Sequence, residues 1–279
     1  MIVAKELLYL YCVTKDKPST CDFRDLGIKI KPVYFQGTYA LISSVSPEDF
    51  SEDNLKKHLA DMSWVEKNIR LHEKVIEEIM KDQAVLPLKF GTIFESEANV
   101  EKLLKINNVE FKAVLDILEG KEEWGLKIYC NSGYFKDALC SKDERITEID
   151  KEILASGIGK AFFLKKKKDE IIKDIINEKI SEYTKDCFER LKVTAVDTKI
   201  NNILPKEVTE KTEEMVLNAA FLINNKRMKE FQNVMEYIKT KYADKGLLFD
   251  STGPWPPYNF CGSLKEKTSN GQSDKNHTG

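Results

Sequence analysis

The sequence predicts an α+β protein with two domains, each a ferredoxin-like sandwich of a mixed or antiparallel sheet and packed helices. Three observations support this fold class. Strand-like and helix-like segments alternate without the strict strand–helix repetition of a doubly wound fold. Both halves end in a strand, a helix and a glycine-led strand, GLKIYC in the first half and GLLFDS in the second. The chain has 279 residues, near the ~250–300 residues at which a single core stops growing.

The first half, residues 1–130, is predicted to follow the order β-β-α-β-α-β. Residues 6–13 are short, apolar and rich in β-forming residues, which indicates a buried strand. A second strand, or a hairpin bent around Gly37, is expected over residues 33–45. A short helix is expected over residues 54–61.

A capping box, Ser63-Trp64-Val65-Glu66, predicts the start of a longer helix that runs to about residue 81. Its apolar stripe falls at helical spacing and comprises Val65, Ile69, His72, Ile76 and Ile79. We therefore interpret His72 as a core histidine bonded to a backbone group. An acid–base pair with Glu73 is disfavoured because adjacent helical side chains point in different directions.

The segment VLPLKFGTIF, residues 85–94, predicts a strand that contains Pro87. Proline has no N–H to donate to a sheet, so this strand is expected at a sheet edge or with a bulge.

A helix is predicted from Ser96, which caps it, to Glu119. The Asn-Asn pair at 107–108 suggests a break in it, and Gly120 suits its end. Residues 123–130 then complete the first half as a strand.

The second half is predicted to follow the order α-β-β-α-β. Residues 131–160 are rich in charge and serine and are the candidate linker. The elements expected after it are a helix over about 166–190, strands over 191–200 and 215–223, a helix over 226–242 and a strand over 246–252.

These elements place the domain boundaries. Residues 1–132 are predicted to form the N-terminal α+β domain. Residues 133–264 are predicted to form a ferredoxin-like domain that the segment GPWPPYNF closes. Residues 265–279 are polar and are expected to be a disordered tail.

The charge balance disfavours nucleic acid and membrane partners. The net charge is −2, with no overall bias toward an anionic partner. The run Lys165–Lys168 is followed by acidic residues and has no interleaved aromatics, so we interpret it as a solvated helix start. No apolar run reaches the ~18–20 residues needed to span a membrane. A soluble, cytoplasmic protein without a membrane span is expected.

No catalytic or metal-binding motif stands out. The six cysteines include no C-x-x-C pair, and they are interpreted as reduced, mostly buried thiols. The segment SGIGKAFF is not a phosphate loop, because Leu154 and Ala161 replace its first glycine and its hydroxyl. Neither a nucleophile elbow nor a dinucleotide fingerprint occurs. We therefore expect no enzyme, no cofactor and no metal.

The segment Gly253–Phe260, GPWPPYNF, combines three prolines with three aromatic residues. Proline restricts the backbone, so this segment has few conformations to lose when it becomes ordered. The aromatic side chains bring a large apolar area. The segment follows directly on the last predicted strand. A latch over the domain's own core or edge is the preferred interpretation, and a surface for a partner is the other.

The ordered set of these segments resembles the gas vesicle protein L/F family (GvpL/GvpF). PLKFGT at 87–92 and GPWPPY at 253–258 are its most specific parts. Further matching segments are LLYLYCV, Trp64 ahead of HEKV, EWG, GKAFFLKKK and LNAAFLI. The resemblance spans about residues 5–261. One departure is Phe162-Phe163, which stands where a tyrosine is common in the family.

The resemblance implies a two-domain α+β fold with a ferredoxin-like domain and a role in building gas vesicles. Family members look like accessory or minor structural components. They associate with the small hydrophobic shell protein and with other accessory proteins, in the cytoplasm and at the gas vesicle. No catalytic residues come with the family, which agrees with the search above.

Two candidate contact surfaces follow from the sequence, and each is also a candidate fold determinant. The first is the edge strand and the turn after it, with Pro87, Phe90 and Gly91. The second is the C-terminal segment, with Pro254, Trp255, Pro256, Pro257 and Tyr258.

Two other functions stay open. The first is an enzyme or regulator that binds a small ligand on a ferredoxin-like scaffold, which would require perturbed carboxylates or histidines around a pocket. The second is nucleic acid binding through Lys165–Lys168, which would show a steep salt dependence.

Overall fold

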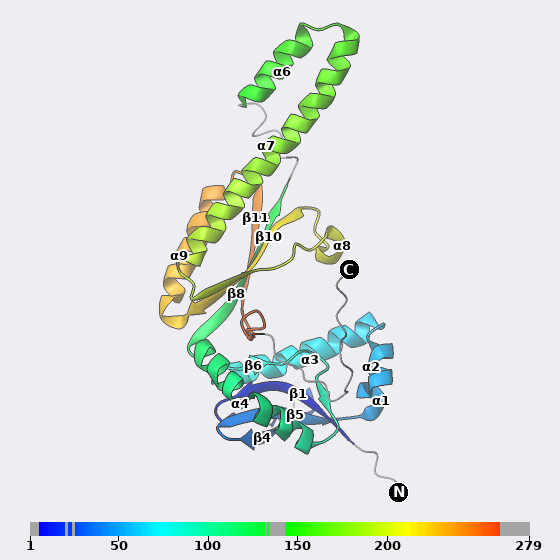
Figure 1. The fold of residues 1–279 in the computed structure, drawn as a ribbon, viewed down its shortest axis with the longest axis vertical. Helices are drawn as coiled ribbons and strands as arrows, with labels where there is room; N and C mark the ends of the chain where they lie inside the picture. Colours follow the sequence, from blue (N-terminus) through cyan, green and yellow to red (C-terminus); the bar gives the residue numbers. More distant parts are fainter. Residues whose placement is uncertain (1–5, 20–21, 24–25, 132, 134–142, 263–279) are drawn as a thin grey trace, which may run out of the picture. The chain divides into compact units, whose positions relative to one another are not determined.

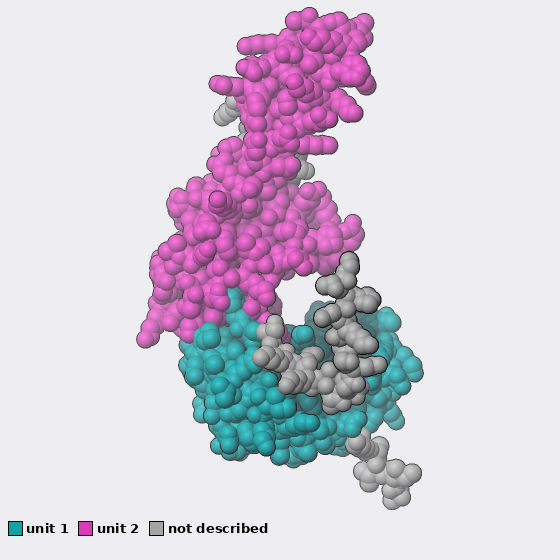
Figure 2. Space-filling view, in the orientation of Figure 1, with its two compact units in different colours: residues 1–119, 260–279 teal, residues 120–259 magenta. Residues whose placement is uncertain are grey.

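The computed structural model describes residues 6–19, 22–23, 26–131, 133 and 143–262. The chain divides into two compact units, shown in Figure 2. Unit 1 comprises Met1–Glu119 and Phe260–Gly279, and unit 2 comprises Gly120–Asn259. Both units combine helices with antiparallel sheets, so the α+β fold class is confirmed.

Unit 1 is built on an antiparallel sheet in the order β4-β5-β1-β6, with β7 also paired to β1 (Figure 1). The strands are β1 (Leu7–Thr14), β4 (Lys31–Phe35), β5 (Thr38–Val45), β6 (Leu86–Pro87) and β7 (Ile93–Phe94), and β2 (Asp22–Phe23) pairs separately with β3 (Ile28–Lys29). The helices are α1 (Pro47–Phe50), α2 (Glu52–His58), α3 (Met62–Met80) and α4 (Glu97–Leu118). Among the described residues, no α-helix lies between β1 and the hairpin β4–β5, so this part of unit 1 departs from the β-α-β-β-α-β order of a ferredoxin-like domain.

Helix α3 begins at a different cap from the predicted one. The carboxylate of Asp61 accepts hydrogen bonds from the amides of Ser63 and Trp64, at 3.0 and 3.3 Å. Ser63 therefore lies inside the helix, and the predicted capping box is wrong. The predicted apolar stripe is buried only in the second half of the helix. Ile69 is exposed, whereas the buried residues are His72, Val75, Ile76 and Ile79.

Helix α4 is capped by Ser96 as predicted and is not broken at the Asn-Asn pair. Both asparagine side chains have hydrogen-bond partners within the fold. The Asn107 amide donates to a carbonyl one turn earlier in the helix. The Asn108 amide donates to the Phe35 carbonyl and the Thr38 hydroxyl, at 3.2 and 3.0 Å. Asn108 thus ties α4 to the turn between β4 and β5.

Unit 2 is built on an antiparallel sheet in the order β11-β8-β10-β9. The strands are β8 (Lys121–Cys130), β9 (Asp197–Ile200), β10 (Glu214–Asn224) and β11 (Leu247–Trp255). The helices are α6 (Glu144–Leu154), α7 (Ile158–Lys192), α8 (Lys206–Thr209) and α9 (Met228–Tyr242). The main elements run β8-α7-β9-β10-α9-β11, which is the element order of a ferredoxin-like domain.

The division between the units differs from the predicted boundary at 132/133. It falls between Glu119 and Gly120, because β8 pairs with both β10 and β11 along its length. The end of the chain, from Phe260, groups with unit 1. The unit to which a strand belongs is decided by the strands with which it pairs. These are distant in sequence, so a local change of composition does not reveal them.

The predicted linker at 131–160 contains α6 and the start of α7. Helix α7 begins at Ile158, earlier than predicted, and β9 is shorter than the predicted strand over 191–200. The second half of α7 packs on the sheet of unit 2 through Cys187 and Leu191. Its first half pairs with α6 instead, in a helical hairpin.

The hairpin of α6 and α7 has its own small core and two ion pairs. Its buried residues are Ile146, Ile172 and Ile175. Arg145 donates to both carboxylate oxygens of Glu178, at 3.1 and 2.9 Å. The Lys168 ammonium lies 2.6 Å from a carboxylate oxygen of Asp150. The helix pair is therefore held together along its length.

The cysteines of the described residues are buried free thiols, as predicted, at Cys12, Cys130, Cys187 and Cys261. Cys21 and Cys140 lie outside the described residues, as does the predicted tail at 265–279.

Candidate functional site

The first predicted contact surface is folded into unit 1. Pro87 is buried and pairs with Cys12 of β1, at the edge position that a proline-containing strand prefers. The amide of Leu88 then donates to the carbonyl of Tyr11, at 2.9 Å. The single strand predicted over 85–94 is split into β6 and β7 by a turn that holds Phe90 and Gly91, both half-buried.

A buried polar network connects this turn to β1 and α3. The Gly91 amide donates to the Tyr9 hydroxyl at 3.0 Å. The Tyr9 hydroxyl lies 2.9 Å from Nδ1 of His72, to which it can donate. The His72 ring also hydrogen-bonds to the Leu88 backbone. The PLKFGT segment is thereby bound through its own backbone, at two points, to side chains of two other elements.

Burial sets the electrostatics of the network. It lowers the pKa of His72 to about 4, against the opposing effect of the hydrogen bond to Leu88. It also raises the pKa of the Tyr9 hydroxyl. Tyr11 stacks on the His72 ring, with ring centroids 5.8 Å apart. His72 is therefore a neutral core histidine near pH 7, as predicted.

The glycine of PLKFGT is required by the backbone. Gly91 has φ +78°, a conformation that L side chains rarely adopt. A Cβ atom at this position would also lie 3.3 Å from a methyl carbon of Leu55. Phe90 packs edge-on against the rings of Tyr9 and His72. These contacts give this part of the motif a role in the fold of unit 1.

The second predicted contact surface continues β11. The strand extends through Trp255, so the first half of GPWPPYNF is part of the sheet. The Gly253–Pro254 peptide bond is cis. A Cβ atom at Gly253 would lie 2.9 Å from the carbonyl oxygen of Glu123 and 3.0 Å from the Trp124 ring. Only glycine fits at this close crossing of β11 over β8.

The end of the segment is tied back to β8 by Glu123. Its carboxylate is buried and accepts two hydrogen bonds from Asn259, one from the backbone amide at 3.0 Å and one from the side-chain amide at 2.6 Å. Burial raises the pKa of Glu123, and the two hydrogen bonds oppose that rise. Pro256 and Pro257 are buried. These contacts are those of a latch within unit 2.

Part of the same segment stays open to solvent. Pro254 is exposed, and Trp255 and Tyr258 keep 42% and 38% of their surface exposed. The Trp255 indole N–H donates to the Thr252 hydroxyl at 2.9 Å, which fixes the ring. The candidate contact surface of this segment is therefore reduced to Pro254, Trp255 and Tyr258.

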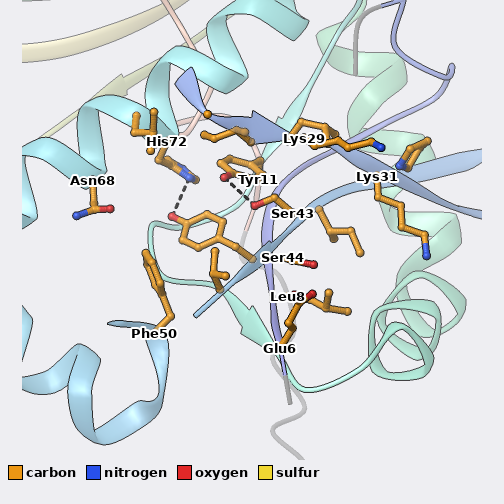
Figure 3. Close-up of a pocket in the computed structure, with 18 of the residues that line it drawn as sticks. Glu6, Leu8, Tyr11, Lys29, Lys31, Ser43, Ser44, Phe50, Asn68 and His72 are labelled. Carbon is orange, nitrogen blue, oxygen red and sulfur yellow. Dashed lines mark hydrogen bonds between the residues drawn. The ribbon is translucent and has the colours of Figure 1, made fainter. Parts of the chain in front are cut away.

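Unit 1 also contains a pocket of about 770 Å³ that sequence reasoning missed (Figure 3). Its lining combines apolar side chains with the Tyr11 and Ser43 hydroxyls, which lie 3.1 Å apart. Asn68 of α3 and Lys29 of β3 also line it. Its volume is that of small-molecule sites. No sequence motif marks it because its lining comes from elements spread over more than half of unit 1.

The end of the α6–α7 hairpin carries an apolar surface that sequence reasoning also missed. Leu154, Ile158, Phe162 and Phe163 are 87%, 94%, 69% and 72% exposed. The two phenylalanine rings lie edge to face, with centroids 5.9 Å apart. The sequence shows Phe162-Phe163 next to a lysine run, but exposure is decided by which face of α7 packs on α6.

In the part of the chain that the structure describes, no group of three or more His, Cys, Asp or Glu side chains is placed to hold a metal ion. None of its helices is long and apolar enough to cross a membrane.

Known proteins share both the sequence pattern and the fold. The family model for gas vesicle synthesis protein GvpL/GvpF matches residues 7–262. Gas vesicle protein L of a Streptomyces species is 24% identical and aligns over 93% of this chain and 94% of its own length. Gas vesicle protein F of a Nostoc species is 26% identical over 91% of this chain and 97% of its own length.

Two solved structures show the same fold. The gas vesicle protein GvpF from an Anabaena species superposes with a TM-score of 0.71 at 21% identity, covering 92% of this chain and 98% of that chain. GvpF from Microcystis aeruginosa gives a TM-score of 0.63 at 18% identity, covering 91% and 98%. Since the family model spans nearly the whole sequence, the chain belongs to the GvpL/GvpF family of gas vesicle synthesis proteins.

Proposed function

We propose that this protein is an accessory or minor structural protein of gas vesicle assembly. It binds the gas vesicle shell protein and other gas vesicle accessory proteins, in the cytoplasm and at the gas vesicle. The observation that carries this proposal is the family match over residues 7–262. It is supported by the presence of both specific motifs, PLKFGT and GPWPPY, as ordered parts of the two sheets.

The physical need for such a protein comes from the shell subunit. A subunit with a water-repelling face aggregates unless that face is covered before assembly. This chain has 32% charged residues, which keep most of its surface solvated. It also holds an exposed tryptophan and an exposed tyrosine on a latched strand end. Because the latch already orders these rings, binding costs little conformational entropy.

Within this proposal, Pro254, Trp255 and Tyr258 form the surface that contacts the shell protein. The edge strand is a weaker candidate, since Pro87 is buried and Phe90 packs in the aromatic cluster around Tyr9.

The test is co-expression of this chain with the shell protein from the same genome, followed by affinity purification. The wild-type chain should retain the shell protein, and Trp255→Ala with Tyr258→Ala should lose it while the melting temperature holds. Tyr237→Ala removes a comparably exposed aromatic ring on α9 and should retain it. An unrelated α+β protein is the negative control. Separation of the wild-type chain from the shell protein would refute shell binding.

A second candidate function is the binding of a small ligand by a regulator, and the pocket of unit 1 favours it. The sequence predicted such a site on a ferredoxin-like scaffold, whereas the pocket lies in unit 1, which departs from the ferredoxin-like element order. A ligand that raises the melting temperature of the wild-type chain, but not of a Ser44→Phe variant with a filled pocket, would support this function. Equal shifts in both chains would exclude the pocket as the site.

A further inference from the structure

The apolar surface at the end of the α6–α7 hairpin has no partner within the described residues. Helix α7 packs on α6 through Ile172 and Ile175, and Leu164 is also buried. Leu154, Ile158, Phe162 and Phe163 lie outside that contact and are at least two-thirds exposed. Figure 1 shows that, within unit 2, this end of the hairpin extends past the end of the sheet. We call residues 151–167 the hairpin tip.

The hairpin tip is strongly basic in a chain that is slightly acidic overall. It contains five lysines, all exposed, against the single acidic residue Glu152, a formal charge of +4. The chain as a whole has a net charge of −2. Lys165, Lys166 and Lys167 follow the phenylalanine pair within one to two helical turns. Lys168 already forms an ion pair with Asp150 of α6. Asp169 and Glu170 follow in the same helix, but among the described residues Lys165, Lys166 and Lys167 form no ion pair, so apolar side chains and lysines share one surface.

We propose that the hairpin tip docks an acidic amphipathic segment of another protein. The apolar face of that segment covers Leu154, Ile158 and the phenylalanine pair. Its flanking carboxylates meet the lysines of α7. Burial of two aromatic rings supplies affinity, and the charges supply orientation and partner choice.

The charge of the tip argues against a second copy of this chain as the occupant. A contact between two tips would place five lysines of one copy against five of the other, and like charges at an interface are unfavourable. The chain's own C-terminal segment at 265–279 contains no large apolar residue, so it cannot cover the phenylalanines.

The backbone at the start of α7 argues against a lipid surface. Its N-cap is Gly157, which has no side chain to cap the first amides, and the first helical hydrogen bond is donated by Ala161. Insertion of this end into hydrocarbon would strand the amides of residues 158–160 without acceptors. Carboxylates of an acidic protein segment can accept from these amides as well as from the lysines.

The experiment uses the full chain and two labelled synthetic peptides. One is a helical peptide with leucine and phenylalanine along one face and glutamate on the flanks. The other has lysine in place of every glutamate. Binding is followed by fluorescence anisotropy. The acidic peptide should bind, the lysine peptide should bind at least about tenfold more weakly, and binding of the acidic peptide should weaken with salt.

Variants of the tip locate the contact. Phe162→Ala with Phe163→Ala should weaken binding of the acidic peptide about 10- to 100-fold, the range expected for loss of buried aromatic anchors. Lys165→Glu with Lys166→Glu brings the formal charge of the tip to zero, so it should also weaken binding and largely remove its salt dependence. Val109→Ala removes an equally exposed apolar residue from α4 and should change nothing.

Three results would overturn the inference. They are equal binding of both peptides, unchanged binding by the phenylalanine variant, and retention of the chain on phosphatidylserine vesicles without any binding of the acidic peptide. The inference does not depend on the shell protein as a partner, so a failed shell-protein purification leaves it standing.

Discussion

Acidification from pH 8 to pH 5 is expected to destabilise unit 1 through His72. The pKa of this residue is about 4 in the folded chain and 6.5 in its unperturbed state. In the unfolded chain His72 therefore binds a proton below about pH 6.5, whereas in the folded chain it does so only near pH 4. One pKa unit corresponds to ~1.4 kcal/mol, so the pKa difference of His72 lowers the free energy of unfolding by at most about 3 kcal/mol, which is reached below pH 4. About 2 kcal/mol of it is lost at pH 5.

The assay is denaturant unfolding at the two pH values, read from a single tryptophan in unit 1. The chain has three tryptophans, and replacing Trp124 and Trp255 with phenylalanine leaves Trp64 of α3 as the reporter. In this background, His72→Gln should remove about 2 kcal/mol of the pH dependence, since glutamine does not titrate. Val109→Ala, an exposed and uncharged position on α4, is the control and should keep it. If the His72→Gln variant loses as much free energy at pH 5 as its parent, the assignment of the pH dependence to this histidine is wrong.

Three further predictions concern unit 2. Asn259→Ala should lower the unfolding free energy by about 1–3 kcal/mol in denaturant titrations, because the buried Glu123 carboxylate loses one of its two donors, the Asn259 side-chain amide; an unchanged midpoint would show that this contact does not stabilise unit 2. Gly253→Ala should be more destabilising than Gly157→Ala in thermal melts, because only the first places a Cβ atom against backbone. Asp186→Asn should cost about 1 kcal/mol at pH 7, reduced by solvent screening, and less at pH 2, because the pKa of Asp186 is held low chiefly by the Arg190 hydrogen bond and its stabilisation shrinks as pH falls; equal losses at both pH values would contradict this.

Local patterns in the sequence were sufficient for most elements of the fold. The apolar run at 6–13, the cap at Ser96 and the strand at 123–130 each depend on neighbouring residues, and the structure contains all three elements. The start of α3 was predicted wrongly because Asp61 and Ser63 are both suitable N-cap residues. The Asp61 carboxylate accepts the hydrogen bonds from the first amides of the helix. The boundary between the units depends on which strands pair, which is a property of the whole sheet.

Less of the candidate site than of the fold could be predicted from the sequence. The motifs PLKFGT and GPWPPY can be recognised in the sequence, but the residues that contact them are distant along the chain. Tyr9 bonds to Gly91, and Glu123 bonds to Asn259. The pocket and the hairpin tip have no local pattern of their own. Phe162-Phe163 would suit a buried helix face equally well, and only the packing of α7 on α6 leaves both rings exposed.

The proposed role in building gas vesicles is tested most directly by the vesicle yield with and without this chain. The gas vesicle gene set of the same genome would be expressed complete, with this chain omitted, and with this chain restored from a second plasmid. Omission is expected to leave few or no buoyant vesicles and an aggregated shell protein, and restoration is expected to recover both. Vesicles of normal number and buoyancy in the absence of this chain would contradict the proposed role.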